Sequence, residues 1–412
     1  MRHLSILAAF ATLTTGAALA EPSVEVMHCW TSGGEAAALG AVRDAVVAQG
    51  VAWIDAPFAG GGGDRAKTAL QARIAPGNPP AAMLMLGQNI IDRANEGMLG
   101  NVDALAAAQG WDAVLPAAVQ EFAKIGGHYV SVPTIVQRTD MMWLSVAAFD
   151  AIGAEYPGTW AEFNALAPAL EAAGIIPLAH GGQAWQEACM FEAVVAGVGG
   201  AEFYRQALVD LDDAALRGPQ MLDVFTQMAT LRDMVDSNAP GRDWNLATAM
   251  VINGQAAAQI MGDWAKGEFT NAGLVPGTDY VCLPVPKDQG DAFVYLVNSL
   301  SLFNQTDPDQ IHAQEVLASA IMDPAVQVAF NIAKGAIPAR TDVDVSGLDA
   351  CAQATLAAMA SNDAGGTAVP TFAGTHAAIV GAATDAITEF CNSDMMPADG
   401  VTLLADSIAD AM

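Results

Sequence analysis

Short apolar stretches alternate along the chain with longer stretches whose apolar residues recur every three or four positions. Segment 24–28 alternates like a half-buried strand, and the apolar residues from Leu39 to Val46 have helical spacing. Ser32 and Glu35 form a capping box, so we expect this helix to begin just after Ser32. An extended segment, a turn and a helical segment follow in the same order over residues 51–74. This alternation predicts an α/β fold.

The same alternation continues to the C-terminal part of the chain. We predict further helices at 88–97, 112–124, 160–173, 186–197, 220–236, 245–253, 310–321, 324–332, 351–360 and 376–390. We predict further strands near 129–136, 258–261, 280–284 and 293–303. A chain of 412 residues without an internal repeat is long enough for two domains.

Three extended or proline-containing segments are candidates for crossings between the two domains. They are 129–133, 283–287 and 337–340. Three crossings make each lobe discontinuous. We therefore predict a first lobe of residues 21–132 plus 290–340 and a second lobe of residues 133–289 plus 341–412.

The first twenty residues have the features of an export signal. A short positive start with Arg2 precedes an apolar run from Leu4 to Ala11, and Ala18-Leu19-Ala20 forms an A-x-A cleavage site. We expect cleavage after Ala20 and a soluble product in the periplasm. The alternative of a buried N-terminal helix explains the cleavage site less well.

The composition is strongly acidic. Sixteen Lys and Arg residues face 45 Asp and Glu residues, which gives a formal net charge of −29. Nucleic-acid binding and attachment to anionic lipid both need basic surfaces, so the charge argues against these functions.

Signatures of catalysis and of metal or cofactor binding are weak. The glycine run 60–63 lacks the ending of a phosphate-binding loop, and a turn is the simpler interpretation. The six histidines are scattered, so we expect no metal and no cofactor. Five cysteines fit no zinc motif, and the odd count leaves at least one thiol unpaired, with the pairing open. Because 45 acids make chance carboxylate pairs inevitable, an exported carbohydrate-active enzyme remains an alternative.

Three tryptophans lie in segments rich in glycine and polar residues. Trp30, Trp185 and Trp264 are not part of an apolar helical stripe. An indole ring offers a flat face that packs on the C–H face of a sugar, and nearby amides and carboxylates can bind its hydroxyls. The three together favour a carbohydrate site over ordinary core positions. We expect a structural role for four other tryptophans, which are Trp53, Trp111, Trp143 and Trp160.

Seven segments carry a family resemblance when taken in order. They are WTSGGE (30–35), GGGGD (60–64), GNPP (77–80), HGGQ with WQ (180–186), GRDWN (241–245), MGDWAKGEF (261–269) and KGAIPAR (334–340). Together they resemble the extracellular solute-binding proteins of family 1 that serve ABC sugar importers, specifically the glucose/mannose-type branch. The resemblance covers essentially all of the chain after residue 20.

The resemblance implies a two-lobed periplasmic binding protein, a clamshell with three hinge crossings that closes on a sugar. It implies a monomer without catalytic activity, which delivers the sugar to a membrane permease and its ATPase subunit. The residues that it places at the ligand are Trp30, Glu35, Gln137, Trp185, Gln186, Asp263, Trp264, Asn298 and Lys334. For Arg242 and Trp244, a structural role is the favoured interpretation.

Several positions differ from the family pattern near the ligand. The chain has Leu84 and Leu86 where relatives often carry Gln and His, and Gln137 and Asn298 where they carry His and Asp. Asp140 replaces an Asn, and a late family His falls near Thr371 or Phe372. Leucines leave a buried sugar hydroxyl without a partner, so a less polar sugar is a candidate ligand. A non-sugar solute, paired through Arg242 or Lys334, is the other open alternative.

Overall fold

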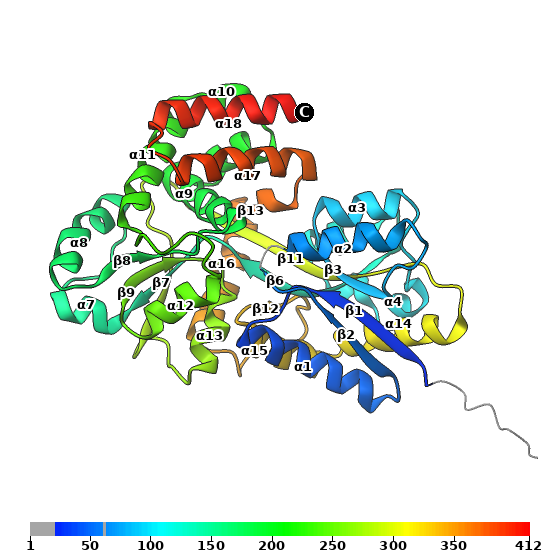
Figure 1. Ribbon diagram of the computed structural model, residues 1–412. Helices are drawn as coiled ribbons and strands as arrows, with labels where there is room; N and C mark the ends of the chain where they lie inside the picture. Colours follow the sequence, from blue (N-terminus) through cyan, green and yellow to red (C-terminus); the bar gives the residue numbers. More distant parts are fainter. Residues whose placement is uncertain (1–20, 61–62) are drawn as a thin grey trace, which may run out of the picture.

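Two β-sheets, each packed between helices, form the two lobes of the protein (Figure 1). The computed structural model describes residues 21–60 and 63–412. The predicted signal segment 1–20 and part of the glycine run 60–63 lie outside the described residues.

The first lobe is built on the larger sheet, with the strand order β12-β6-β11-β3-β1-β2 and β13 paired to β11. Strands β1, β2 and β3 are parallel, whereas β11 runs antiparallel to β3 and β6. The strands are β1 (Ser23–His28), β2 (Ala52–Pro57), β3 (Ala82–Leu86), β6 (Ser131–Arg138), β11 (Phe293–Leu302), β12 (Ile337–Pro338) and β13 (Ala368–Pro370). The short hairpin β4 (Lys124–Ile125) and β5 (His128–Tyr129) lies beside them. The helices of this lobe are α1 (Gly33–Ala48), α2 (Asp64–Ile74), α3 (Gln88–Asn95), α4 (Asp103–Ala108), α5 (Trp111–Val114), α6 (Ala117–Ala123), α14 (Pro308–Ile321) and α15 (Pro324–Lys334).

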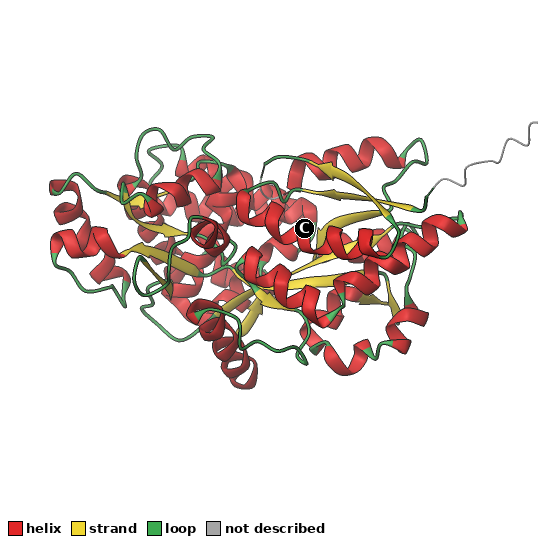
Figure 2. Cartoon of the chain, turned by 90° about the horizontal axis from the view of Figure 1, so that it is seen from below, coloured by secondary structure: helices red, strands yellow, loops and turns green. Residues whose placement is uncertain are grey.

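The second lobe is built on the smaller sheet, with the strand order β10-β7-β9-β8. Its strands are β7 (Met141–Ser145), β8 (Ile176–Ala179), β9 (Ala256–Ile260) and β10 (Tyr280–Pro284). Its helices are α7 (Val146–Ile152), α8 (Trp160–Ala172), α9 (Ala184–Tyr204) with a π-helical turn (Arg205–Val209), α10 (Asp213–Leu216), α11 (Pro219–Met234), α12 (Trp244–Ile252), α13 (Ala265–Asn271), α17 (Ala377–Cys391) and α18 (Pro397–Ala411). Between β12 and α17 lie α16 (Ala350–Gly365) and the 3₁₀ turn Phe372–Gly374. The two groups of strands remain separate when the molecule is seen from below (Figure 2).

Each lobe has its own apolar core. In the first lobe Val24 and Val26 of β1 pack with Leu39 and Val42 of α1. In the second lobe Leu144 of β7 belongs to a separate cluster with residues from α8, α9, α11, α17 and α18. Burial of these apolar side chains is the main force that stabilises each lobe.

The predicted start of α1 is confirmed in atomic detail. The Ser32 hydroxyl accepts from the Glu35 N–H, and the Glu35 carboxylate accepts from the Ser32 N–H, so the capping box is complete. These bonds satisfy backbone groups that the first turn of a helix leaves without intrahelical partners.

The sheet pairing changes the predicted lobe boundaries. We predicted that the second lobe begins at residue 133, but β6 pairs with β11 in the larger sheet from Ser131 to Arg138. We therefore place the first crossing at Thr139 and Asp140. The segment after residue 340 is also divided, because β13 pairs with β11 whereas α17 packs on α9.

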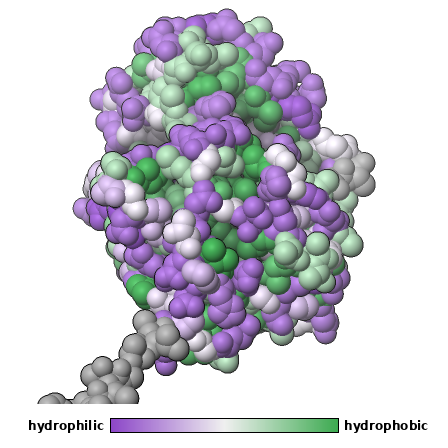
Figure 3. Space-filling model, turned by 90° about the vertical axis from the view of Figure 1, so that its right-hand side faces the viewer, coloured by the Kyte–Doolittle hydropathy of each residue, from purple (hydrophilic) through white to green (hydrophobic). Residues whose placement is uncertain are grey.

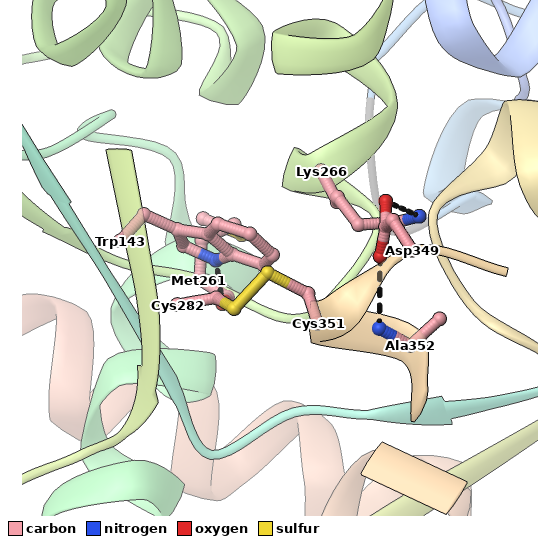
Figure 4. Close-up of a disulfide and its surroundings, with 7 residues drawn as sticks. All are labelled: Trp143, Met261, Lys266, Cys282, Asp349, Cys351 and Ala352. Carbon is pink, nitrogen blue, oxygen red and sulfur yellow. Dashed lines mark hydrogen bonds and ion pairs between the residues drawn. A yellow bond between two sulfur atoms is a disulfide. The ribbon is translucent and has the colours of Figure 1, made fainter. Parts of the chain in front are cut away.

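One disulfide joins two segments that are far apart in the sequence. Cys282 of β10 bonds to Cys351 of α16, and close by the Trp143 indole N–H donates to the Met261 carbonyl (Figure 4). Cys29, Cys189 and Cys391 are free thiols. The prediction of at least one unpaired thiol is confirmed.

We expect the double variant Cys282→Ser/Cys351→Ser to lose roughly 2–4 kcal/mol of unfolding free energy, because this bond restricts a long loop in the unfolded chain. Denaturant titration of both proteins measures the loss. A reductant should lower the melting temperature of the wild type but not that of the double variant. A reductant effect of equal size on both proteins would contradict this role.

The surface mixes polar and apolar residues. On the face shown in Figure 3, apolar residues are interspersed among polar ones. Within residues 21–60 and 63–412, no single helix is long and apolar enough to cross a membrane. In the part of the chain that the structure describes, one pair of helices, α14 and α15, meets the criterion of length and composition when taken together, with a bend of 70° between them. Both helices contribute to the core through Leu317 and Phe330.

Candidate functional site

The first group of predicted site residues lies where α1 and α15 meet in the first lobe. The Lys334 ammonium contacts the Glu35 carboxylate at 2.8 Å, and both side chains are buried. Lys334 Nζ also lies 5.6 Å from the ring centre of Trp30, which packs against Phe330. One oxygen of Glu35 caps α1 through the Thr31 and Ser32 N–H groups, which leaves the other for Lys334. The structure thus brings Trp30, Glu35 and Lys334 together.

A second group joins the two lobes through a buried polar network. Gln137 and Asn298 lie on the neighbouring strands β6 and β11, and Asn298 Nδ2 donates to Gln137 Oε1 at 2.7 Å. Asp263, between β9 and α13, receives a hydrogen bond from the Gln137 amide at 3.4 Å. The Arg138 N–H donates to its other oxygen at 2.8 Å. Two residues of the first lobe therefore meet one carboxylate of the second.

The environment of Asp263 changes its acidity. Burial raises the pKa of the Asp263 carboxyl to about 7, even though the Arg138 N–H and the nearby Lys334 and Lys266 ammonium groups favour the ionised form. The folded chain therefore retains a proton on Asp263 over a pH range in which the unfolded chain releases it.

We expect Asp263 to make the protein less stable as the pH rises. Its folded-state pKa lies above the ordinary value of 3.8, so its contribution to the free energy of unfolding falls between about pH 4 and pH 7 and then levels off. Denaturant titrations of the wild type and of Asp263→Asn across this range measure the effect. The stability of the wild type relative to the variant should decrease with pH, and a constant difference would contradict the assignment.

Two indole rings lie side by side at the edge of the polar network. The ring centres of Trp185 and Trp264 are 6.3 Å apart with the planes tilted by 44°. Trp264 is 9% exposed and Trp185 is half-buried, and the Trp185 N–H donates to Gln183 Oε1. An aromatic pair held in this way offers apolar faces beside hydrogen-bonding groups, which suits a molecule with both kinds of surface.

Gln186 is linked to these groups indirectly, through Gln183 Oε1, which also accepts from the Trp185 N–H. Its side chain is completely buried, and its amide donates to Gln183 Oε1 and to the Arg242 carbonyl. Arg242 itself forms an ion pair with Asp236 and donates to the His180 carbonyl. These contacts give Gln186 and Arg242 a structural role in holding the 180–186 segment.

Of the leucines and the threonine that differ from the family pattern, Leu86 lies beside the polar network, whereas Leu84 is opposite Leu300 and Thr371 contacts Glu192. Leu86 of β3 is paired with Asn298 of β11, and both Leu84 and Leu86 are half-buried. Thr371 is buried, and its hydroxyl donates to Glu192 at 2.8 Å. Glu192 also accepts from the Phe372 N–H, and burial raises the pKa of this carboxyl.

Sequence reasoning missed the ion pair at the first crossing. Arg138 and Asp140 are buried and form a two-point contact, with N–O distances of 2.9 and 2.8 Å. Asp140 also accepts from the Val294 N–H, and Arg138 donates to the Ala292 carbonyl. The pair thus fixes the first crossing to the segment that leads into β11. The sequence did contain a sign of this ion pair, because Arg138 and Asp140 carry opposite charges within a largely apolar segment.

The remaining features of the described residues give no sign of a metal site. Within residues 21–60 and 63–412, no three His, Cys, Asp or Glu side chains gather as metal ligands would.

Two surface hollows of about 360 Å³ lie away from the candidate residues. One is beside Phe203 and Gln220, and the other is beside Ser145 and Asp279.

Known proteins resemble this chain over nearly its whole length. A family model described as "Bacterial extracellular solute-binding protein" matches residues 53–321. A "Probable sugar-binding periplasmic protein" of Rhizobium meliloti (strain 1021) is 46% identical over 402 residues, which cover 97% of this chain and 96% of the relative. A protein of the same description from Brucella suis biovar 1 (strain 1330) is 44% identical over 392 residues, which cover 94% and 92%.

Solved structures share the fold at low sequence identity. A chitin oligosaccharide binding protein has a TM-score of 0.81 at 18% identity, with coverage of 94% of this chain and 98% of that chain. Maltose-bound MalE3 of T. maritima has a TM-score of 0.77 at 15% identity, with coverage of 95% and 100%.

Proposed function

Because the chain belongs to the bacterial extracellular solute-binding proteins, we propose that it is the sugar-binding component of an ABC importer. It binds a sugar between the two lobes and delivers it to a membrane permease with its ATPase subunit. The names of relatives that are 44–46% identical support a sugar as the solute and the periplasm as the location. We further propose that the chain acts as a monomer and is cleaved after Ala20.

The observation that carries this proposal is the polar and aromatic junction between the lobes. Gln137 and Asn298 of the first lobe meet Asp263 of the second, and Trp264 follows Asp263 directly. A ligand that contacts groups on both lobes binds the closed form better than the open form, so it shifts the population towards closure. No covalent chemistry is needed for this function.

We propose that Trp185 and Trp264 contact the sugar ring and that Asp263, Gln137 and Asn298 bind its hydroxyls. Trp30, Glu35 and Lys334 form the adjoining wall of the site in the first lobe. Gln186 contributes indirectly, through its contact with Gln183.

The sugar that fits best is less polar than glucose on one side. Leu86 of β3 is paired with Asn298, Leu84 lies two residues before it opposite Leu300, and neither side chain supplies a hydrogen-bonding group. A hydroxyl buried against them loses its bond to water without a replacement, whereas a deoxy or methylated position loses nothing. The site therefore favours a deoxy or methylated relative of glucose over glucose itself.

A thermal-shift screen of residues 21–412 tests the proposed class of ligand. The panel contains monosaccharides, disaccharides, deoxy and methylated sugars, and small carboxylic acids. A ligand that binds only the folded protein raises the melting temperature. We expect the largest shift from a sugar. A shift from acids alone would contradict the sugar assignment, and product release from oligosaccharides would indicate an enzyme instead.

A further inference from the structure

The N-terminus of α1 and helix α13 touch across the two lobes without side chains between them. A Cβ atom on Gly34 would lie 2.8 Å from the carbonyl carbon and 2.9 Å from the Cα of Gly267. A Cβ atom on Gly267 would in turn lie 2.8 Å from the Ala333 carbonyl oxygen near the end of α15. Real Cβ atoms do not approach backbone this closely, so the contact requires glycine at both positions.

A side chain of the second lobe adds a directed polar bond to this contact. The carboxylate of Glu268, on α13, accepts from the Gly34 N–H at 2.9 Å. The first N–H groups of a helix have no intrahelical partner and carry a partial positive charge, so a carboxylate there is favourable. The bond is made from one lobe to the other, and it is lost when the lobes separate.

The contact lies next to the proposed ligand groups in the sequence of both lobes. Gly34 directly precedes Glu35, and Gly267 follows Trp264 by three residues. A movement that separates the lobes at the ligand groups therefore acts on residues directly next to this contact.

We propose that Gly34, Gly267 and Glu268 form a latch that is made only when the lobes close and that sets how readily they close. This inference rests on the proposed function. In the closed form the latch adds a hydrogen bond and close packing. In the open form both helices lose this contact, so the latch contributes to ligand affinity without contacting the ligand.

Gly34→Ala tests the latch without disturbing α1 itself. Gly34 does not need a positive φ, and alanine is a better helix former than glycine. Gly40→Ala is the matched control, because it lies in the same helix and its Cβ would meet only the Arg43 guanidinium, at 3.7 Å.

Isothermal titration with the panel solute of largest thermal shift measures the effect. We expect Gly34→Ala to bind roughly 10- to 100-fold more weakly than the wild type, the loss typical of an overpacked contact. Gly40→Ala should bind like the wild type. The melting temperature of ligand-free Gly34→Ala should not fall. Wild-type affinity in Gly34→Ala would overturn the latch, and a lower melting temperature would show a permanent structural contact instead.

Amide hydrogen exchange tests the latch without a ligand, so failure of the latch can be distinguished from failure of the proposed function. If the wild type binds no panel solute, the proposed function fails, but exchange at residues 33–36 still reports on the contact. Ligand-free molecules close for a small part of the time, and the latch protects these amides only then. We therefore expect faster exchange there in Gly34→Ala than in Gly40→Ala, because the added Cβ displaces the Glu268 carboxylate from the Gly34 N–H. Equal exchange in the two variants would overturn the latch.

Discussion

Replacement of Asp140 by Ala is expected to lower the free energy of unfolding by roughly 3–5 kcal/mol, the cost of leaving a buried charge without its partner. The Arg138 guanidinium is buried at the first crossing, and Asp140 meets it at two points. The substitution also removes the acceptor of the Val294 N–H. Denaturant titration of the wild type and of the variant measures the loss.

Asp342→Ala provides a matched control for this prediction. Arg340 and Asp342 have the same spacing in the sequence and the same two-point contact, at 2.8 Å for both bonds, but the Asp342 side chain is 44% exposed. We expect a loss of at most about 1 kcal/mol, because exposed ion pairs contribute little. Equal losses in the two variants would show that burial does not decide the strength of the Arg138–Asp140 pair.

Replacement of Glu35 by Ala is the second change with a large expected effect. It leaves the buried Lys334 ammonium without its carboxylate and removes one half of the capping box of α1, the acceptor of the Thr31 and Ser32 N–H groups. We expect the free energy of unfolding to fall by roughly 3–5 kcal/mol, mainly because of the unpaired charge. Chemical denaturation followed by circular dichroism measures this loss.

Glu162→Ala separates the cap from the ion pair. Glu162 forms the same capping box with Thr159 at the start of α8, and its carboxylate accepts from the Gly158 and Thr159 N–H groups, but it is exposed and has no ammonium partner. We expect a much smaller loss of stability in this variant. A loss as large as that of Glu35→Ala would assign the effect to the cap rather than to Lys334.

Local features of the fold could be predicted from the sequence, because they depend on residues a few positions apart. The capping box of Ser32 and Glu35 is an example, and so are the helical periods of α14 and α15. Strand β7 was missed because all five of its residues are buried, so its sequence does not alternate. The helices α13 and α18 were also missed.

The first crossing was predicted at the extended segment 129–133, which lies inside the strand that we also predicted near 129–136, and the structure continues this strand in the larger sheet to Arg138. Pro133 lies inside β6, opposite Ser299, and the register shifts between Asn298 and Ser299 at this place. The shift is a bulge, and bulges are positions where a strand tolerates proline. The extra residue is Thr134 of β6, which lies between the partners of Asn298 and Ser299, and the sequence around Pro133 does not reveal that the strand continues past it in the same sheet.

The candidate site could be predicted in part. The resemblance named nine residues from distant segments, and the structure brings eight of them into three adjoining groups, whose contact with a sugar stays a prediction. Gln186 is the exception, because its partners Gln183 and Arg242 depend on how the 180–186 segment folds against residues 236–242. The Cys282–Cys351 bond and the contact of Gly34 with Gly267 likewise join segments that are distant in the sequence.

Isothermal titration of residues 21–412 and of Trp264→Ala, with the sugar of largest thermal shift, tests whether a sugar binds at the junction of the two lobes. We expect one sugar per wild-type chain and an affinity that falls at least roughly tenfold in Trp264→Ala, the loss typical of a buried aromatic anchor. Because Trp264 is 9% exposed and belongs to an apolar cluster, its removal also lowers the melting temperature, so the titration is made at a temperature at which circular dichroism shows the ligand-free variant to be folded. Unchanged affinity in Trp264→Ala, or no heat of binding with the wild type, would contradict a sugar site at the junction of the two lobes.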